Sequence, residues 1–434
     1  MQKIHSMLTK PVDSRLLGVF RIFFGLCIIY ELVYYVKIDL LNLGLRQPVM
    51  LFPYKGFEWI HLLPGKGMEV ILFLLFISAL CITAGFMLRI SAVVFFIGFA
   101  WIYFLDKGLY NNHLYLLILI SLLFVVTDAD AALSISKRKH LNLLPAWQLM
   151  VFQFQIIVVY FYGGLAKLNA DWLIRLQPAK SIIPDSFDSW LIYIIVYGGL
   201  LFDLIIGFAL LWKRTRVVAI LTAIIFNITN AIIFNDIGVF PFFMIGALML
   251  FIDPALFAKW FKQPAQATRK KSGTKKESQL QRTSMFKWSF LVVYVAFQLL
   301  FPFRYIFYKG NVDWYGEGQR FSWRMKIQQR DMIEFKLSVL DYSTKKIMTL
   351  DPVSYLTSAQ LFSVKQDPQM LMALVKFIEA DAKKKGIRSP YIKARCIVTF
   401  NGRAAQPMVD PEKNLCTING NDPVSNWVMP LQNP

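Results

Sequence analysis

The feature that most constrains this chain is a series of long apolar runs separated by short polar turns. The hydrocarbon core of a bilayer is about 30 Å thick, so a helix needs roughly 20 apolar residues to cross it. Charged residues make up 17% of the chain, whereas soluble domains average about 25%. We therefore expect an all-α polytopic transmembrane bundle of about nine spans. Their approximate bounds are 16–36, 68–88, 89–106, 111–127, 148–167, 189–212, 216–235, 237–252 and 286–307.

Basic residues fall in every second loop between these runs, which is typical of cytoplasmic loops. The net charge of +20 is explained by these loops, so we expect no nucleic acid partner. An N-terminus in the cytoplasm and nine spans place everything after about residue 308 outside the cytoplasm. We expect a multi-pass protein of the cell (inner) membrane. The basic groups are Lys3, Lys10 and Arg15, then Arg89, Lys137 to Lys139, Lys213 to Arg216, and Arg269 to Lys276.

Two polar segments complete the predicted organisation. Residues 253–285 are rich in Lys, Gln, Ser and Thr, which predicts a basic cytoplasmic linker within a transmembrane domain of residues 1–307. In residues 308–434, FKLSVLDYSTKKIMTL and YIKARCIVTFNGR alternate apolar and polar residues as strands do. Between them, Asp367-Pro368 and Gly386 bracket a run with helical spacing. We expect an extracytoplasmic α+β, mostly β, domain there.

Polar residues inside membrane helices are costly, and they are usually paired or functional. Three groups fall at the predicted outer ends of their spans, beside the C-terminal domain, and a fourth lies on the first span. The groups are Lys167; Asp106, Lys107, Asn111, Asn112 and His113; Asn227, Asn230, Asn235 and Asp236; and Arg21 with Glu31. Convergence of the first three at one depth favours a functional site.

Each group also has a structural interpretation. Lys167 could extend its side chain to the membrane interface, and the asparagines could link helices through hydrogen bonds. His113 could be a hydrogen-bonded core residue. Arg21 could pair with an acid or with carbonyl groups, and Asp203 could be its partner or that of another buried base. Cys396 and Cys416 leave a disulfide open. Because no Cys/His cluster is present, we expect no metal site.

The segments YFLDKGLYNNHLYLL and QIIVVYFYGGLAKLNADW closely resemble two signature segments of the vitamin K-dependent γ-glutamyl carboxylases, which are HTTM-domain membrane proteins. The resemblance is collinear across nearly the whole chain. It includes KPVDSRLLGVFRIFFG, GFMLRIS, LLFDLIIGF, FNITNAIIF, GNVDWYGEGQRFSWRMKI and DPEKNLCTINGNDPVSNWVMPL.

The resemblance implies an enzyme that deprotonates reduced vitamin K or menaquinol, which then reacts with O2 to give a strongly basic alkoxide. The alkoxide removes a γ-proton from a Glu residue of an extracytoplasmic peptide or protein. The carbanion adds CO2, and the quinone leaves as an epoxide. By resemblance, Lys167 is the expected base and His113 a second catalytic residue. The expected quinone-binding residues are Asn112, His113, Asn230 and Tyr160, and the expected substrate-binding residues are Trp323, Arg324 and Arg330.

The chain also departs from the family. Ala166 and Asn169 differ from the animal enzymes beside the lysine. Gln328 and Val424 replace a histidine and an arginine thought to hold the substrate carboxylate, whereas Arg330 is retained. The long C-terminal extension of the animal enzymes is missing, so we expect a bacterial-type homologue. These departures keep two alternatives open: a quinol epoxidase or monooxygenase without carboxylation, or a non-catalytic membrane scaffold with an outer partner-binding domain.

Overall fold

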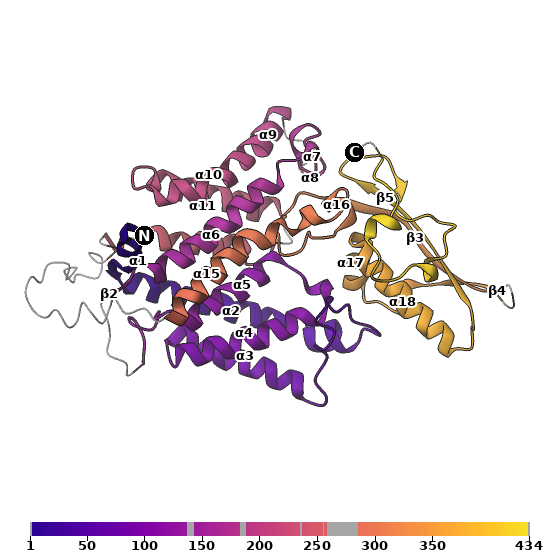
Figure 1. Ribbon diagram of the computed structural model, residues 1–434, viewed down its shortest axis with the longest axis horizontal. Helices are drawn as coiled ribbons and strands as arrows, with labels where there is room; N and C mark the ends of the chain where they lie inside the picture. Colours follow the sequence, from indigo (N-terminus) through magenta and orange to yellow (C-terminus); the bar gives the residue numbers. More distant parts are fainter. Residues whose placement is uncertain are drawn as a thin grey trace, which may run out of the picture.

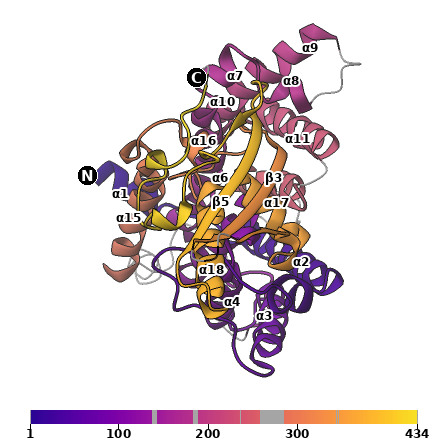
Figure 2. The ribbon, with the colours of Figure 1, turned by 90° about the vertical axis from the view of Figure 1, so that its right-hand side faces the viewer.

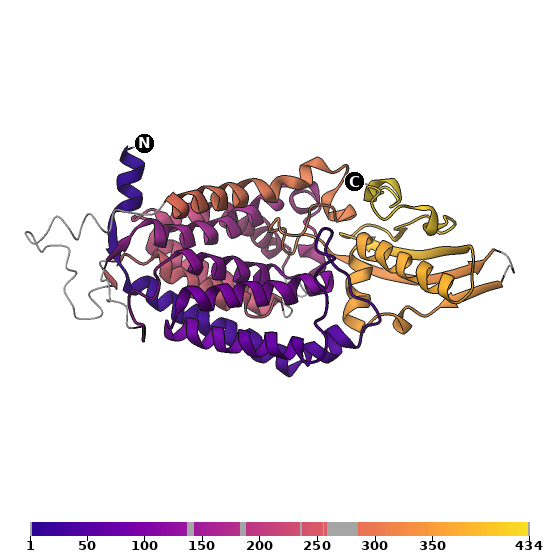
Figure 3. The same cartoon turned by 60° about the horizontal axis from the view of Figure 1, so that its bottom comes forward.

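The long apolar runs form helices that lie roughly side by side along the long axis of the molecule (Figure 3). The computed structural model describes residues 2–136, 143–182, 188–234, 237–254, 256–257, 285–342, 344 and 346–432. The main helices of the bundle are α2 (Arg15–Lys37), α3 (Gly67–Ala84), α4 (Leu88–Leu105), α5 (Asn112–Val126), α6 (Trp147–Ala166), α10 (Gly199–Leu211), α11 (Arg216–Ile233), α12 (Phe240–Ala247) and α15 (Met285–Leu300).

Shorter elements extend or join these helices. A π-helix, η3 (Ile194–Gly198), joins α9 (Ser189–Tyr193) to α10, and η5 (Phe301–Phe307) continues α15. The remaining short elements are α1 (Gln2–Thr9), η1 (Leu40–Arg46), η2 (Lys107–Leu109), α7 (Ala170–Leu173), α8 (Ala179–Ile182), η4 (Leu248–Phe251) and α16 (Val312–Tyr315). Strands β1 (Pro11–Asp13) and β2 (Leu143–Pro145) pair at the end of the bundle far from the C-terminal region (Figure 1).

Among the described residues, seven helices are long and apolar enough to cross a membrane. Two of the seven are composite helices, Trp190–Leu211 and Met285–Phe307. The shorter apolar helices Asn112–Val126 and Phe240–Phe251 occupy the other two predicted segments. Each predicted span therefore coincides with an apolar helix of a multi-pass membrane protein, while the number that cross the bilayer stays a prediction.

The turn between α3 and α4 shows how two spans with almost no polar spacer can be separated. Gly85 has a φ of 71° and ends α3, and Met87 has a φ of 46° immediately before α4. A left-handed residue after a helix satisfies its last carbonyl groups, and glycine adopts that conformation without strain. The chain thus reverses within a few residues, and Arg89 lies in the first turn of α4, where it pairs with Asp128.

The C-terminal region contains an antiparallel sheet with strand order β4-β3-β5-β6. Helices α17 (Ser358–Gln366) and α18 (Pro368–Lys384) pack beside it (Figure 2). Alternate residues of β5 are buried, as expected for a strand with one face on a core. The strands are β3 (Arg330–Asp341), β4 (Lys346–Leu350), β5 (Pro390–Phe400) and β6 (Gln406–Pro407).

Several predictions for this region can be compared with the structure. Both strand segments and the helix after Asp367 are confirmed, and Asp367 caps that helix by accepting from the backbone N–H of Gln369. The expectation of a mostly β domain overstated the sheet, because α18 alone has 17 residues and the longest strand has 12. Cys396 and Cys416 are free thiols. The predictions for Lys137 to Lys139, Asn235, Asp236 and most of the linker lie outside the described residues.

Candidate active site

A cavity of about 250 Å³ lies where the helical bundle meets the C-terminal region. Its wall is formed by the first residues of α5, the last turns of α6, and residues of α10, α11 and the segment that follows α16. The sequence-predicted residues that line it are Lys167, His113, Asn112, Asn230, Tyr160 and Arg324. Residues from distant parts of the chain are therefore brought to one site.

Lys167 is paired with Asp203 inside this cavity. The distance from Lys167 Nζ to Asp203 Oδ2 is 2.5 Å, and both side chains are about one-tenth exposed. Nζ also lies 5.0 Å from the centre of the Trp172 ring and 6.0 Å from that of Phe226. The sequence left open whether Asp203 pairs with Arg21 or with another buried base. In the structure its partner is Lys167. The Lys167 side chain is thus turned into the bundle.

Glycines on α6 and α10 lie beside this pair. A Cβ atom at Gly163 would lie 3.4 Å from Asp203 Oδ2, and one at Gly199 would lie 3.9 Å from Lys167 Nζ. A Cβ atom at Gly164 would lie only 2.9 Å from the backbone nitrogen of Leu204, so a side chain there would push the helices apart. Small residues allow membrane helices to approach closely, and here they bring the amine and the carboxylate into contact.

The start of α5 contributes an imidazole and two amides. Asn111 caps the helix by accepting from the backbone N–H of His113. Nε2 of His113 lies 3.8 Å from Oε2 of Glu31 on α2, and its Nδ1 has no hydrogen-bond partner among the residues that the structure describes. The side-chain oxygen of Asn112 accepts from the Tyr110 hydroxyl. His113 thus lines the cavity, and one of its ring nitrogens is buried without a partner among the described residues.

A phenol and a further amide come from α6 and α11. The Nδ2 atom of Asn227 donates to the Tyr160 hydroxyl at 2.9 Å and to the carbonyl of Ala223 at 2.8 Å. Tyr160 and Asn227 are both almost completely buried. The phenol oxygen accepts one hydrogen bond in this arrangement and keeps its own proton for donation to a molecule in the cavity.

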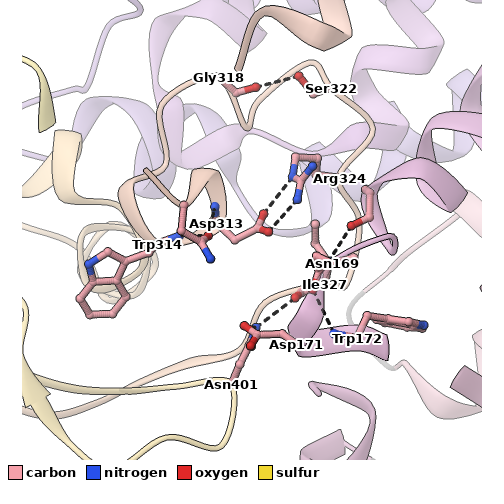
Figure 4. Close-up of polar contacts among 12 residues, drawn as sticks. Asn169, Asp171, Trp172, Asp313, Trp314, Gly318, Ser322, Arg324, Ile327 and Asn401 are labelled. Atoms are coloured by element: carbon pink, nitrogen blue, oxygen red, sulfur yellow. Dashed lines mark hydrogen bonds and ion pairs between the residues drawn. The ribbon is translucent and has the colours of Figure 1, made fainter. Parts of the chain in front are cut away.

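The segment after α16 closes the cavity from the side of the C-terminal region. Three residues in it, Phe321, Trp323 and Lys326, have φ values between 51° and 59°, which is the left-handed region that few non-glycine residues adopt. Arg324 forms a bidentate pair with Asp313, with distances of 2.9 and 2.7 Å (Figure 4). Strain of this kind persists where surrounding contacts hold it, and it is common at functional sites.

The helical turn after Lys167 links the site to the sheet. Asn169 caps α7 by accepting from the backbone N–H of Trp172. Asp171 accepts from Arg403 at 2.5 and 3.0 Å and from Asn401 at 2.9 Å; Figure 4 shows the contact with Asn401. Asn401 and Arg403 follow β5, so a buried ion pair fixes the turn beside Lys167 to the C-terminal region.

Two sequence-predicted substrate-binding residues do not line the cavity. Arg330 is buried and donates to the carbonyls of Trp314 at 2.5 Å and Gln366 at 2.9 Å. Burial lowers the pKa of Arg330 to about 10, which still leaves a cation at neutral pH. Trp323 is fully buried, with its ring 5.0 Å from that of Tyr115. Both side chains support the fold around the site.

The predicted group at the start of α5 is split by the structure. Asn111, Asn112 and His113 line the cavity, whereas Asp106 accepts from Gln360 of α17 at 2.8 Å. Asp106 therefore belongs to the contact between the bundle and the C-terminal region.

A second cavity of about 280 Å³ adjoins the first. The two share Trp172, Gly199, Phe226 and Lys326 among their lining residues. The second is almost entirely apolar, and it lies between the η3–α10 helix and α11. Near it, Ile194 and Ile225 are more than half exposed at the outer surface of the bundle. An apolar chain attached to a ligand in the first cavity could extend here.

Sequence reasoning missed the contacts of Glu31 and the site position of Lys326. Glu31 was grouped with Arg21, yet its partner is His113. Lys326 lies over the Phe234 ring at 5.2 Å and lines both cavities. For Glu31 the available signal was its charge, since each ionisable residue in an apolar run needs a partner, whereas Lys326 lies in a polar segment without such a signal. Which partner it has depends on how the helices are rotated, which the sequence does not show.

The arrangement suits a small aromatic molecule that carries oxygen atoms. An amine–carboxylate pair, an imidazole, a phenol and amides converge on a cavity with aromatic walls. A few polar groups within apolar walls are the usual design of a ligand site. Lys167 and Asp203 can hold or move a proton, and the other groups can orient an oxygen.

Comparisons with known proteins agree with this geometry. The HTTM domain model matches residues 9–256, which is more than half of the 434 residues. The model of the vitamin K-dependent gamma-carboxylase lumenal domain matches residues 283–434. No solved structure matches the chain. The cavity receives Lys167 from the first matched region and Arg324 from the second. The chain therefore belongs to the vitamin K-dependent gamma-carboxylase family of HTTM-domain membrane proteins.

Proposed function

We propose that the protein is a γ-glutamyl carboxylase that uses reduced vitamin K or menaquinol, with O2 and CO2, to carboxylate Glu in an extracytoplasmic peptide or protein. Family membership supports the reaction class. The observation that carries the proposal is the Lys167–Asp203 pair, which is buried in an apolar cavity shared with His113 and with the lumenal region.

The lining of the cavity fits a reduced naphthoquinone. Trp172 and Phe226 offer ring faces, and Nδ1 of His113 is a buried polar atom without a partner among the described residues. The adjoining apolar cavity fits the isoprenoid chain. When bound, the hydroquinone supplies the electrons for the reduction of O2 and generates the strong base that the carboxylation needs. His113, Asn112, Asn230 and Tyr160 are proposed to hold its oxygen atoms.

Lys167 and Asp203 are proposed to act together as the initial base. An ammonium already paired with a carboxylate cannot accept a further proton by itself. Nζ can take a proton from a ligand oxygen only as it gives one to Oδ2 of Asp203, and the 2.5 Å contact permits that transfer. The pair then holds one additional proton, and the ammonium remains beside the new negative charge. Burial in an apolar site strengthens that interaction.

The peptide end of the site is proposed to lie at Arg324 and Lys326, because these cations reach the cavity from the lumenal region. Arg324 is held by Asp313, so its position is fixed before a ligand arrives. Trp323 and Arg330 act in this proposal by holding the strained segment and the sheet in place. The carboxylate of a substrate Glu would form charge-assisted hydrogen bonds with the cations Arg324 and Lys326.

A quinol epoxidase without carboxylation is the second candidate. The observation that favours it is the environment of Arg330, whose guanidinium is engaged by backbone carbonyls and not directed into the cavity. Gln328 and Val424 provide no positive charge at the two positions noted in the sequence. Of the described residues proposed to bind the substrate carboxylate, only Arg324 and Lys326 then remain in the cavity.

The proposal places residues 1–307 in and at the inner (cell) membrane, with a cytoplasmic N-terminus, and residues 308–434 outside the cytoplasm. The basic loops support this orientation. The name of the lumenal domain model also points to a C-terminal region outside the cytoplasm. In this arrangement a lipid-soluble quinol can reach the site from the bilayer, and a peptide can reach it from the outer side.

Membranes that contain the protein test the proposal directly. Supplied with reduced vitamin K or menaquinol and O2, they are expected to form the quinone epoxide, and Lys167→Ala is expected to abolish it. Lys336→Ala is a matched control, because Lys336 is exposed on β3. Labelled CO2 incorporated into a Glu-containing peptide separates the two candidates. Absence of epoxide with the unaltered protein and both quinols would reject them both.

A further inference from the structure

Glu31 is a buried carboxylate that the proposed reaction does not use. It lies in the outer half of α2, is 5% exposed, and faces α5 rather than the cavity itself. A carboxylate at this depth in a membrane helix is costly unless it has a partner or a task. Its ion-pair contact is with His113, which does line the cavity.

The His113 ring connects Glu31 to the cavity. Oε2 of Glu31 lies 3.8 Å from Nε2, and Nδ1 is buried without a hydrogen-bond partner among the described residues. A neutral imidazole carries one proton and shows one lone pair. Which nitrogen carries the proton is set by the group that faces the other nitrogen. A carboxylate beside Nε2 therefore favours the proton on Nε2 and leaves the lone pair on Nδ1.

Local packing keeps the ring in this position. The capping of α5 by Asn111 fixes the backbone of His113. Gly238, with a φ of 54°, approaches the ring so closely that a Cβ atom there would lie 3.5 Å from Cε1. The ring is thus held between α2 and the segment before α12. Glu31 can bias its tautomer without itself touching a ligand.

We propose that Glu31 is a positioning residue that fixes the tautomer of His113, so that Nδ1 accepts a hydrogen bond from a hydroxyl group of the bound ligand. The inference rests on the proposed function and adds that the ligand must present a hydroxyl group to His113. The cavity then has two base–carboxylate pairs, Lys167 with Asp203 and His113 with Glu31. Each pair addresses one hydroxyl, and a mono-hydroxy compound can satisfy only one of them.

Ligand binding without oxygen tests the inference separately from catalysis. The probes are 2-methyl-1,4-dihydroxynaphthalene and its 1,4-dimethoxy analogue, and the signal is quenching of tryptophan fluorescence, since Trp172 lines the cavity. The unaltered protein is expected to bind the diol at least about tenfold more tightly than the diether. Glu31→Gln is expected to weaken binding of the diol about five- to thirtyfold and to change that of the diether less than twofold.

Two further variants separate positioning from a structural role. Glu31→Asp keeps the carboxylate and is expected to recover part of the loss. In a His113→Asn background, Glu31→Gln is expected to have no further effect on diol binding, because the group it positions is gone. Glu69→Gln is the matched control at an exposed site on α3. Thermal unfolding shows whether each variant is folded.

Equal diol affinity in Glu31→Gln and the unaltered protein overturns the inference. It is also overturned if Glu31→Gln weakens diol binding as much in the His113→Asn background as in the unaltered protein. If Glu31→Gln does not fold, the His113→Asn variant decides, and equal diol affinity in that variant and the unaltered protein overturns the inference. Diol binding that depends on Glu31 in a protein that forms no epoxide supports the inference while rejecting the proposed function. The two failures are therefore distinguishable.

Discussion

Two buried cations, Arg21 and Lys167, differ in how the bundle satisfies them. Arg21 is fully buried, and its guanidinium donates to the carbonyls of Ile82 and Thr83 at 2.6 and 2.7 Å, and to two more beyond α5. Lys167 instead has one carboxylate and an open cavity. The guanidinium of Arg21 therefore holds chain segments together, whereas the amine of Lys167 can still meet a molecule in the cavity.

Arg21→Met is expected to destabilise the protein strongly. Four carbonyl groups lose their donor, and each buried unsatisfied group costs about 1 to 3 kcal/mol, so a loss of at least about 3 kcal/mol is expected. Arg21→Lys is expected to recover part of it. The measurement is thermal unfolding of the purified protein in detergent. Arg46→Met, at an exposed pair with Glu69, is the control with little effect expected. An Arg21→Met variant as stable as this control contradicts the expectation.

Asp203→Asn tests whether the amine acts alone. The amide cannot take the proton that Nζ must give up, so epoxide formation is expected to fall about 100-fold or more. Groups that act as a unit show non-additive losses. The double variant Lys167→Ala/Asp203→Asn is therefore expected to be no slower than Lys167→Ala. Initial rates of epoxide formation in membranes check this. A rate for Asp203→Asn equal to that of the unaltered protein would show that the reaction does not need the Asp203 carboxylate.

At this scale the sequence identified the charges but not their pairs. Lys167 and His113 were found because each interrupts or ends an apolar run. The pairing of Lys167 with Asp203 depends on the close approach of α6 and α10 at Gly164. Helix rotation and separation are set by packing along the entire contact, so no local pattern of residues encodes them.

The short helix α7 and the turn after β5 form the element that joins the two regions. Asp171 and Arg403 are each less than one-tenth exposed and lie 2.5 Å apart. Removing one partner takes the closest opposite charge from the other, although Asp171 keeps Arg175 at 3.6 Å and the amide of Asn401 at 2.9 Å. Because Asp171 lies one turn after Lys167, this junction also fixes the amine relative to the lumenal region.

A double-mutant cycle on Asp171 and Arg403 is expected to show strong coupling. Each single change to Ala is expected to destabilise the protein by about 3 kcal/mol, and the pair to show a coupling energy of about 2 kcal/mol. The exposed pair Lys393–Glu412 in the same region provides the control cycle, with no measurable coupling expected. Thermal unfolding in detergent is the measurement. Additive losses at Asp171 and Arg403 would show that the two charges do not stabilise each other.

The elements themselves were mostly predictable, whereas the conformation of the connecting segments was not. Alternation in 335–350 and 391–403 predicted strands that the structure confirms. Nothing in GEGQRFSWRMKI indicates left-handed residues at Phe321, Trp323 and Lys326, because none is a glycine or asparagine. Such conformations are imposed by tertiary contacts, including the hydrogen bond from the backbone N–H of Phe321 to the Tyr110 hydroxyl.

For the whole molecule, the distribution of charge separates the two ends of the bundle. Arg15 and Arg89 lie at the starts of α2 and α4, and Lys213 lies between α10 and α11, whereas Lys167 follows α6 in the cavity beside the lumenal region. Positive charge close to span ends is retained in the cytoplasm during insertion. The same property of the sequence therefore predicts both the orientation of the spans and the side on which a peptide meets the site.

Cysteine labelling of intact cells tests this orientation. Lys309 and Lys213 are exposed and lie after the last described span and between α10 and α11, respectively. In a background with Cys81→Ala and Cys416→Ser, Lys309→Cys is expected to react with a membrane-impermeant maleimide in intact cells. Lys213→Cys is expected to react only after permeabilisation. Cys27 and Cys396 are buried, so they are expected to contribute little background.

The labelling pattern also bears on the reaction. If Lys309→Cys reacts only after permeabilisation while Lys213→Cys reacts in intact cells, the lumenal region faces the cytoplasm and an extracytoplasmic substrate is excluded. Lys213 follows the sixth predicted span and Lys309 the ninth, so three spans are expected to separate them. If both positions react on the same side of the membrane, the number of spans between them is even and this expectation is wrong. The expected pattern would place the cavity that holds the proposed base Lys167 and the proposed peptide-binding cations Arg324 and Lys326 at the outer end of the bundle. A peptide outside the cell could then reach a quinol that remains in the membrane.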